Sequence, residues 1–314
     1  MTTTQIRKRQ GGLRGFIKSF HFERTWQNYL MLLIPGIFVF IFSYIPLYGL
    51  IIAFQDYNPA MGFWGSEFVG LKWFETAMSL PDFKYIVRNT VTIALGKMIF
   101  TQLFSVVFAL MLNELRGQFF KRTVQTITYF PHFLSWVIIG GVFTDMLSTK
   151  GLINQVITLF GARPIFFLGS NDWFQPTMIT LEVWKEFGYG AIIYLAAITS
   201  INPELYEAAT IDGAGRLRQT WHVTLPGIAV TIIMMITLAL GGIMNAGFDQ
   251  IFVMYNAAVY ATGDILDTFI YRQGLIDAQY SLSTAMGLFK SLIGATLLII
   301  TNIFATKKFN YRIF

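Results

Sequence analysis

The sequence predicts an all-α integral membrane protein with six spanning helices. Of the 314 residues, 54% are hydrophobic and only 13% are charged, whereas soluble proteins average about 25% charged residues. Six long apolar runs alternate with polar stretches, and each run is long enough to cross a bilayer, which takes about 20 residues. The chain has no cysteine, which excludes disulfides, thiol catalysis and thiolate metal sites.

The apolar runs give the expected spans in order. Their approximate bounds are residues 29–54, 87–113, 123–144, 174–201, 225–248 and 284–306. Pro35 and Pro46 are expected to bend the first span, which neighbouring helices can compensate. After the third span, Leu152–Phe160 predicts a helix too short to cross the membrane. Residues 29–306 therefore form one membrane domain between tails at 1–28 and 307–314.

The distribution of basic residues predicts the orientation. The tail at 1–28 alternates apolar and basic residues in LRGFIKSFHFERTW, which favours an amphipathic helix on an anionic membrane surface; a solvated basic tail is the alternative. Lys and Arg are abundant in both tails and in the loop 114–122. They are scarce in the loops 55–85, 145–173 and 249–283. The positive-inside rule then places both termini, and the polar stretch 202–224, in the cytoplasm.

The fourth predicted span carries charges in its middle. Glu182, Lys185, Glu186 and Tyr189 are spaced i, i+3, i+4 and i+7, which is one face of a helix. A charge facing lipid at that depth costs at least about 2.5–3.5 kcal/mol, so these side chains are expected to face a polar pathway or one another. The alternative to a substrate pathway is a structural ion-pair network, in which Glu182 pairs with Lys185 along the helix. Glu186 is adjacent to Lys185 in sequence and is not expected to face it.

Two further lysines interrupt apolar runs without a partner in their own span. Lys97 is expected to face the interior of the bundle, where it can neutralise Glu182 or Glu186 or bind an anionic group of the substrate. The same interior roles are open to Lys290, but it lies near the outer end of the sixth span, so we favour extension of its ammonium to the interface.

Asn245, Asp249 and Gln250 cluster beside Phe248 at the outer end of the fifth predicted span. An amide and a carboxylate beside an aromatic ring suit the hydroxyls and faces of a sugar. The same residues are equally ordinary at a membrane edge. On the interpretation that they bind sugar, Asn245 and Asp249 are candidate pathway residues.

Several classes of function have no support in the sequence. No carboxylate or second histidine lies at metal-ligand spacing from His21, His132 or His222, so no metal site is expected. His132 is expected to be packed or hydrogen-bonded. No G-x-x-x-x-G-K-[ST] motif occurs, so we do not expect the chain to bind ATP itself. The basic residues are scattered and form no nucleic-acid-binding module.

The stretch NPELYEAATIDGAGRLRQTWHVTLP, residues 202–226, lies between two spans. Asn202 is a good N-cap and Pro203 suits the first helical position. Gly213 and Gly215 can end the helix. The stretch predicts a short helix outside the membrane that moves with the spans at its ends, as a mechanical coupling element must. A polar loop with one helical turn is the alternative.

Within this stretch, EAA at 207–209, DGAG at 212–215 and Leu225-Pro226 resemble the EAA loop of membrane subunits of binding-protein-dependent ABC importers. In that family, the short helix docks into a groove on a cytoplasmic ATPase and transmits ATP-driven closure. By this resemblance, the residues that couple the chain to an ATPase are Glu207, Ala208, Ala209, Asp212, Gly213 and Gly215.

The resemblance runs from the first to the last span and is closest to the lipo-oligosaccharide or polysaccharide permeases of type I ABC importers. FDQIFVMYN at 248–256, TGDILDTFIYRQGL at 262–275 and GLFKS at 287–291 carry it. The larger membrane subunit of the maltose importer is a more distant relative. Its sugar-contacting positions, aligned on the EAA stretch, fall on Glu182, Lys185, Glu186 and Tyr189, and in the next span on Ala239, Ile243 and Ala246. The last three are small or apolar here, which implies a differently shaped or shifted ligand.

The resemblance also implies partners and a location. The chain would be a six-helix permease of a bacterial plasma membrane, forming half of a translocation path for an oligosaccharide with a second homologous permease. Two copies of a cytoplasmic ATPase would hold ATP and Mg, and an extracellular solute-binding protein would deliver the ligand. The chain itself would bind no cofactor and catalyse no reaction.

Three other readings of the sequence stay open. An ion-coupled secondary transporter could use Glu182 and Glu186 as proton carriers. An intramembrane enzyme could use His132 or the carboxylates. A scaffold or receptor subunit would have no path through it.

Overall fold

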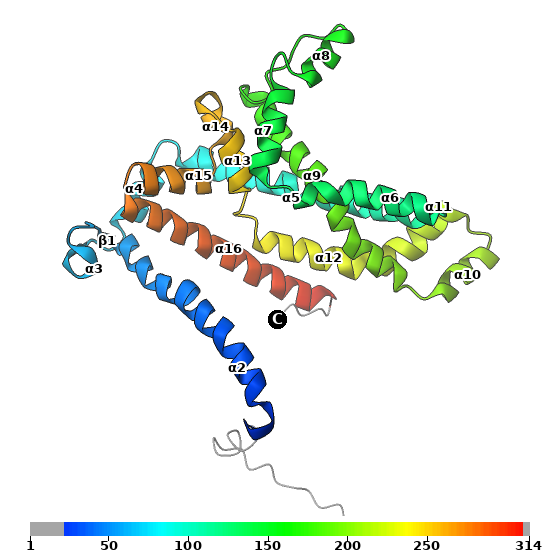
Figure 1. Ribbon diagram of the computed structural model, residues 1–314, viewed down its shortest axis with the longest axis horizontal. Helices are drawn as coiled ribbons and strands as arrows, with labels where there is room; N and C mark the ends of the chain where they lie inside the picture. Colours follow the sequence, from blue (N-terminus) through cyan, green and yellow to red (C-terminus); the bar gives the residue numbers. More distant parts are fainter. Residues whose placement is uncertain (1–21, 310–314) are drawn as a thin grey trace, which may run out of the picture. The chain divides into compact units, whose positions relative to one another are not determined.

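The computed structural model describes residues 22–309, which are helical along most of their length (Figure 1). Within these residues, the strands are β1 (Gln55–Asp56) and β2 (Glu67–Phe68), a short antiparallel pair. The predicted all-α class is therefore confirmed. Most of the tail at 1–28, with its expected amphipathic helix, lies outside the described residues, as do residues 310–314.

The chain forms two compact units, residues 1–51 and residues 52–314. The first unit contains α2 (Phe22–Val39), the π-helix η1 (Phe40–Tyr44) and the start of the 3₁₀ helix η2 (Ile45–Phe54). Pro46 explains the irregular middle of this run, because proline lacks an N–H and its ring clashes with the carbonyl four residues earlier. Pro35 lies inside α2.

Helices of the second unit that frame the candidate site are α5 (Phe83–Glu114), α9 (Asn171–Thr199), α12 (Leu225–Gly241) and α16 (Tyr280–Phe309). Helix α5 packs along α9, and α12 packs on α16. The shorter elements are α3 (Gly62–Gly65), α4 (Lys72–Ser79), α13 (Phe248–Met254), η5 (Ala257–Val259), α14 (Tyr260–Gly263), α15 (Leu266–Tyr271) and η6 (Arg272–Ile276).

Five helical stretches among residues 22–309 are long and apolar enough to cross a membrane. They are Trp26–Phe54, Phe83–Glu114, Trp136–Leu159, Arg216–Gly241 and Tyr280–Ile303. The predicted fourth span is a single helix too, α9, and the charges in its middle set it apart from the other five.

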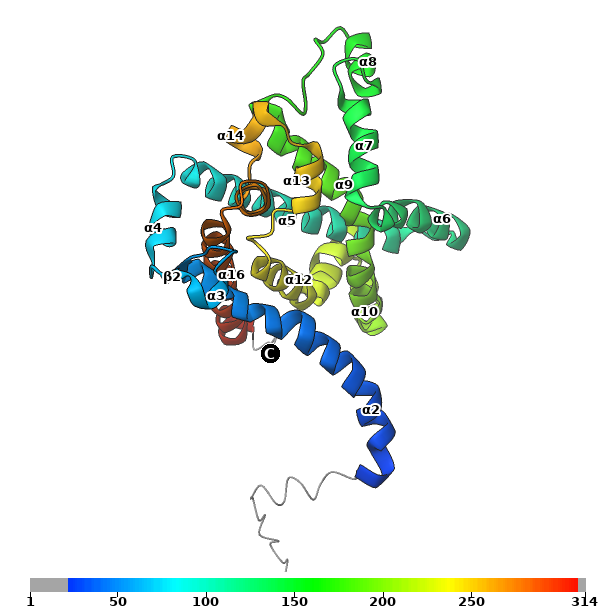
Figure 2. The same ribbon diagram turned by 60° about the vertical axis from the view of Figure 1, so that its left-hand side comes forward.

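The third predicted span, 123–144, is broken in the structure. Helix α6 (Gln118–Tyr129) gives way to a 3₁₀ turn, η3 (Phe130–Phe133), and α7 (Trp136–Leu147) starts again with Ser135 as its N-cap. Pro131 accounts for the break, because it removes a backbone donor from the helix. Figures 1 and 2 show α7 turning away from α6 towards α8 (Leu152–Leu159), the short helix that the sequence predicts.

The fifth predicted span, 225–248, also differs from the structure. Helix α11 (Arg216–Gln219), the π-turn η4 (Thr220–Thr224) and α12 form one continuous helical run that ends at Gly241. Residues 242–247 are not helical, and Gly247 has a φ of 90°. Non-helical backbone at membrane depth is tolerated where protein or a cavity surrounds it, so this segment marks a candidate site.

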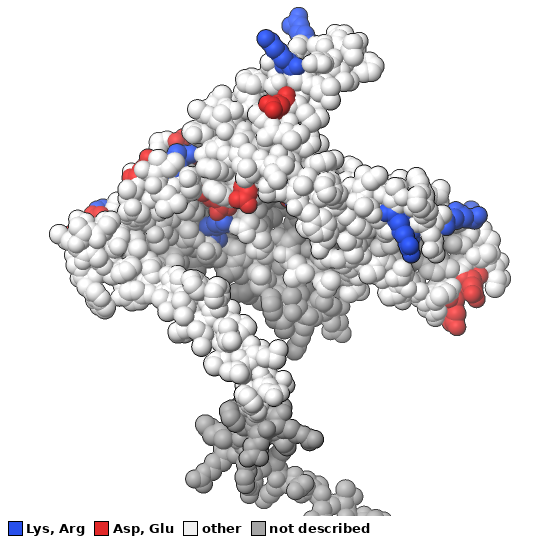
Figure 3. Space-filling model, viewed as in Figure 1, with Lys and Arg blue, Asp and Glu red and all other residues white. Residues whose placement is uncertain are grey.

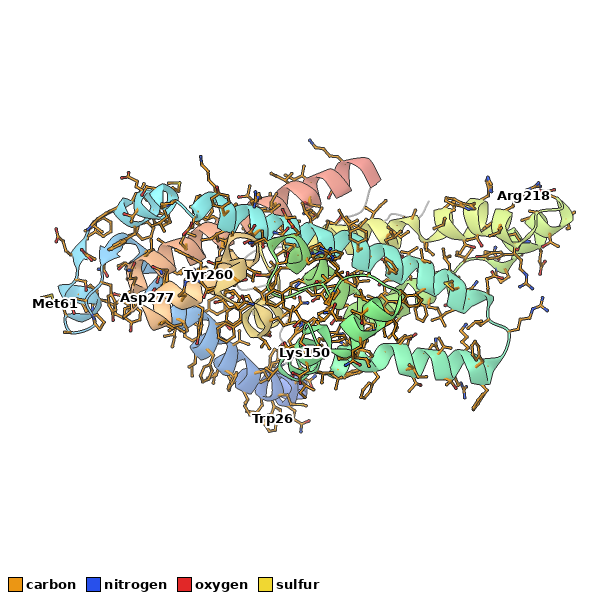
Figure 4. The ribbon with its side chains drawn as sticks, turned by 90° about the horizontal axis from the view of Figure 1, so that it is seen from above. Trp26, Met61, Lys150, Arg218, Tyr260 and Asp277 are labelled. Carbon is orange, nitrogen blue, oxygen red and sulfur yellow. The ribbon has the colours of Figure 1, made fainter. Side chains whose placement is uncertain are left out.

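The polar ends of the second unit lie far apart. Helix α10 (Pro203–Ile211) and the following residues lie at one end, and the β1–β2 loop lies at the other (Figure 1). Figure 4 labels Arg218 and Met61 at these two ends. The arrangement agrees with the predicted topology, which puts the stretch 202–224 and the loop 55–85 on opposite sides of the membrane.

Candidate functional site

A polar cavity of about 250 Å³ lies where the non-helical segment 242–247 faces α5 and α9. Its polar lining comes from three elements and comprises Lys97, Thr101 and Gln102 of α5, Glu182 of α9, and Asn245. The hydroxyl of Thr101 is buried and has no hydrogen-bond partner among the described residues. The cavity therefore offers charged, amide and hydroxyl groups to a polar ligand.

Lys97 connects the two long helices to the irregular segment. Its Nζ donates a hydrogen bond to the carbonyl oxygen of Ala246 at 2.6 Å and lies 3.6 Å from Oε2 of Glu182. Lys97 is only 7% exposed, so both partners are needed to hold its charge. The expectation that Lys97 faces the interior is confirmed, and of the partners expected for it the structure shows Glu182. In the alternative of a structural ion-pair network, Glu182 pairs with Lys185; the structure pairs Glu182 with Lys97 instead.

A second polar cluster surrounds His132 in the break between α6 and α7. Nζ of Lys185 lies 2.7 Å from Oε1 of Glu186 and donates to the carbonyl oxygen of His132 at 2.9 Å. Nδ1 of His132 lies 2.7 Å from Oε2 of Glu186, and its ring stacks on Tyr189 with centroids 3.8 Å apart. The expectation that His132 is hydrogen-bonded is confirmed.

The structure thus divides the charged face of α9 that the sequence predicts. Glu182 joins the cavity, whereas Lys185, Glu186 and Tyr189 gather around His132. Sequence reasoning expected Lys185 not to face its neighbour Glu186, and the 2.7 Å contact corrects this. The reason is that the Glu186 side chain turns towards η3, where the helix break supplies partners that spacing along one helix cannot reveal.

The remaining candidates from the sequence fall on both sides of this division. Ala239, Ile243 and Ala246, the positions matched to sugar contacts, all line the cavity with Asn245. Asp249 is exposed in the first turn of α13. The structure therefore brings Asn245 into the cavity with Lys97 and Glu182.

Sequence reasoning missed three polar residues near this cavity. Thr101 and Gln102 follow Lys97 at i+4 and i+5, a signal that was present in the second span. Asp267 of α15 forms an ion pair with Lys290, so Lys290 has a partner within the protein. The sequence feature that could have revealed this pair is the acidic loop 249–283, which precedes the sixth span and contains Asp267.

A larger cavity of about 650 Å³ is unsuited to a polar ligand. It lies on α5 and α9, and its lining is dominated by Phe100, Phe104, Trp184 and Phe187. Across residues 22–309, no cluster of three or more His, Cys, Asp or Glu side chains is arranged to hold a metal ion.

The predicted coupling helix is confirmed as a local structure. Helix α10 begins after Asn202, whose side chain accepts a hydrogen bond from the N–H of Glu204 at 3.1 Å. It ends before Gly213, which adopts a left-handed φ of 76°. The side chain of Tyr206 is hydrogen-bonded to that of Thr224 at 3.0 Å, and this bond joins α10 to the base of the α12 run.

The coupling candidates are accessible on this helix. Glu207, Ala208, Asp212, Gly213 and Gly215 are exposed, and Ala209 is partly exposed. Ile211 is also 87% exposed.

Residues 102–309 match the family described as the binding-protein-dependent transport system inner membrane component. The chain belongs to this family. Among relatives of the permease, protein LplB of Bacillus subtilis (strain 168) is 43% identical over 88% of each chain. The polygalacturonan/rhamnogalacturonan transport system permease protein YteP of the same organism is 45% identical over 90% of this chain and 88% of YteP.

Solved structures resemble the permease along nearly its whole length. A chain of a bacterial ABC transporter involved in the import of the acidic polysaccharide alginate matches with a TM-score of 0.84 and 36% identity, over 91% of this chain and 97% of that chain. The alginate transporter in complex with a periplasmic protein bound to an alginate pentasaccharide matches with a TM-score of 0.84 and 35% identity, over 93% and 97%. The expected permease fold is confirmed.

Proposed function

We propose that the permease forms half of the translocation path of an ATP-driven importer for acidic oligosaccharides. The observation that carries this proposal is the likeness over nearly the whole chain to a transporter of an acidic polysaccharide, at 36% identity. YteP, at 45% identity, is named for the transport of polygalacturonan and rhamnogalacturonan, which are also acidic. Relatives named for neutral oligosaccharides are more distant, such as GanP at 26% identity.

The substrate would pass through the cavity that Lys97, Glu182 and Asn245 line. Sugar hydroxyls need donors and acceptors to replace water, and this cavity offers an ammonium, a carboxylate, an amide and the hydroxyl of Thr101, which none of the described residues engages. Lys185, Glu186 and Tyr189 stand farther along α9, around His132, and Asp249 is exposed at the start of α13. We assign these four residues to the walls of the pathway beyond the cavity.

The energy for transport would come from a separate ATPase subunit. Helix α10, with Glu207, Ala208, Ala209, Asp212, Gly213 and Gly215, would dock into a groove of a cytoplasmic ABC ATPase, present in two copies that hold ATP and Mg. In that complex, Ile211 would provide an apolar contact beside the acidic side chains of the helix. Both termini would then lie in the cytoplasm.

Two further partners complete the proposed importer. A second homologous permease would supply the other half of the path. An extracellular solute-binding protein would deliver the oligosaccharide, which is supported by the alginate transporter in complex with its periplasmic protein.

Reconstitution in liposomes tests the proposal. The permease is assembled with its companion permease, ATPase and binding protein, and uptake of radiolabelled oligogalacturonate, alginate oligosaccharide and a neutral galacto-oligosaccharide is measured. We expect uptake of an acidic sugar that requires both ATP and the binding protein. Uptake by the permease alone on an ion gradient would instead identify a secondary transporter, and uptake of the neutral sugar only would contradict the acidic substrate.

A further inference from the structure

Two more cavities continue from the one that contains Lys97. The next, of about 530 Å³, shares Gly242 and Asn245 with it and reaches Asp267 and Lys290. The third, of about 370 Å³, shares Asp267 and Ile270 with the second. The second cavity therefore adjoins the first and the third, and we call the three neighbouring cavities together the groove. Figure 3 shows acidic and basic side chains together in a hollow near the middle of the face it draws.

The groove contains two ion pairs of the same kind. Lys97 pairs with Glu182 in the first cavity, and Lys290 pairs with Asp267 where the second and third cavities meet. The side chains of Lys290 and Asp267 are 18% and 20% exposed, so they are shielded from bulk water yet open to the groove. A ligand group that enters the groove can therefore reach Lys290, provided that the side chain of Asp267 turns away from it.

Aromatic rings line the far end of the groove beyond this pair. Phe248, Tyr271 and Tyr280 all line the third cavity, and the ring centroids of Phe248 and Tyr271 are 5.6 Å apart. Aromatic faces pack against the apolar faces of sugar rings, and their polar neighbours bond to hydroxyls. The order along the groove is thus ammonium, amide, ammonium and aromatic rings, which suits a chain of sugars that carry carboxylates.

We infer that Lys290 is a second recognition point for a carboxylate of the substrate, and that Asp267 is the counter-ion that the carboxylate displaces. Without substrate, Asp267 neutralises Lys290 and so lowers the energetic cost of a charge inside a spanning helix. An arriving uronate carboxylate takes the place of Asp267, so the ammonium keeps an anionic partner throughout. This inference rests on the proposed function and adds a residue that discriminates acidic from neutral sugars.

The alternative is that the pair only fastens α15 to α16. The two roles predict different results for the two single variants. If the pair is only structural, Lys290→Gln and Asp267→Asn break the same contact and impair transport alike. If Lys290 recognises the substrate, Lys290→Gln removes the recognising group, whereas Asp267→Asn removes a competitor and leaves the ammonium available.

The test measures concentration-dependent uptake of radiolabelled trigalacturonate and its methyl ester by the complete importer in liposomes. For Lys290→Gln we expect the KM for trigalacturonate to rise about tenfold, as for loss of a hydrogen bond to a charged group. We expect Asp267→Asn and Lys290→Arg to keep or lower that KM. The matched control is Lys72→Gln, which breaks the exposed Lys72–Asp56 pair at 3.3 Å outside the groove.

Three outcomes would overturn the inference. One is an equal effect of Lys290→Gln and Asp267→Asn, the second is an unchanged KM in Lys290→Gln, and the third is an equal loss for trigalacturonate and its ester. The yield of the assembled complex shows whether Lys290→Gln still folds. If it does not fold, the KM values of Lys290→Arg and Asp267→Asn test the inference, and a raised KM in both would overturn it. If the unmodified importer takes up no acidic sugar, the proposed function itself is wrong. If it takes up acidic sugar and one of the three outcomes is seen, only the role of Lys290 is wrong.

Discussion

The Lys185 ammonium donates a hydrogen bond to the backbone carbonyl oxygen of His132 at 2.9 Å. That carbonyl lies in the 3₁₀ turn between α6 and α7, where Pro131 interrupts regular backbone bonding. Glu186 holds both Lys185 and His132 with its two carboxylate oxygens. The helix break is therefore stabilised by side chains of α9.

Replacing Lys185 with Met should destabilise the permease more than an average substitution. The change leaves the partly buried carboxylate of Glu186 without its ammonium and the His132 carbonyl without its donor. Removing one partner of a buried pair costs about 3–5 kcal/mol, and we expect the lower end because Glu186 is 25% exposed. Thermal unfolding in lipid nanodiscs measures this loss of stability. The double variant Lys185→Met with Glu186→Leu should recover part of the loss, and no recovery would argue against the pairing.

Gly247→Ala should destabilise the segment 242–247 and displace Lys97. At a φ of 90°, a side chain is strained by about 1–3 kcal/mol. The added Cβ would also lie 2.7 Å from Nζ of Lys97. Gly242→Ala is the matched control in the same segment, because its Cβ would meet only the carbonyl oxygen of Ala239 at 3.6 Å. Equal melting temperatures for the two variants would contradict this account.

Glu207→Lys in α10 should uncouple ATP hydrolysis from transport. Glu207 is exposed on the proposed docking helix, so its reversal changes the contact with the ATPase and leaves the fold of the permease intact. We expect uptake to fall at least about tenfold, the effect of losing about 1.4 kcal/mol of interaction. ATP hydrolysis stimulated by the binding protein and uptake are measured together. Arg122→Glu, an exposed reversal on α6, is the control, and normal coupling in Glu207→Lys would count against docking.

Arg272→Lys should weaken the outer loops. Nη2 and Nη1 of Arg272 lie 2.5 Å and 3.2 Å from the two carboxylate oxygens of Asp264, a residue only 4% exposed. Lysine cannot make this two-point contact, so we expect a loss of about 1.5–3 kcal/mol, the value of a charged hydrogen bond. Arg88→Lys, where the guanidinium only faces the Tyr85 ring, should cost less. Hydrogen exchange of residues 260–276 reports the effect.

The same ion pair predicts how stability depends on pH. Burial alone would lower the pKa of Arg272, but the hydrogen bond and charge of Asp264 raise it above its ordinary value. A raised pKa in the folded state gives stability that is present below the unfolded pKa and is lost only as pH rises through the folded value. The contribution of Arg272 should therefore stay constant from pH 6 to pH 10, as measured by thermal unfolding. If the stability of the unmodified permease falls between pH 6 and pH 10 and that of Arg272→Gln does not, this prediction is contradicted.

Most of the fold could be predicted from local patterns. Apolar length gave the spans, and Asn202, Pro203 and Gly213 gave the ends of α10, because caps act on the residues beside them. The breaks were harder to place. Pro131 was visible inside a predicted span, but hydropathy alone does not say whether a helix bends or ends there. Gly241, Gly242, Asn245 and Gly247 hinted at a change of backbone in residues 242–247, but hydropathy did not show where the helix ends.

The candidate site was predicted in part for a similar reason. Charges within an apolar span predict an interior position, which holds for Lys97, Glu182 and Lys185. Their partners come from other elements. Lys97 reaches Ala246 across 149 positions, and Lys290 reaches Asp267 across a loop. Spacing along one helix cannot reveal such pairs.

The non-helical residues 242–247 also decide how movement travels through the permease. The helical run from Arg216 to Gly241 is a stiff lever with α10 at its base, and it stops at a joint before α13. A push at the base can be transmitted along this run to Gly241, while α13 and α7, which pack on each other, lie beyond the joint. The two mouths of the path can therefore open in sequence, with the sugar enclosed between them, and need not swing as one rigid body.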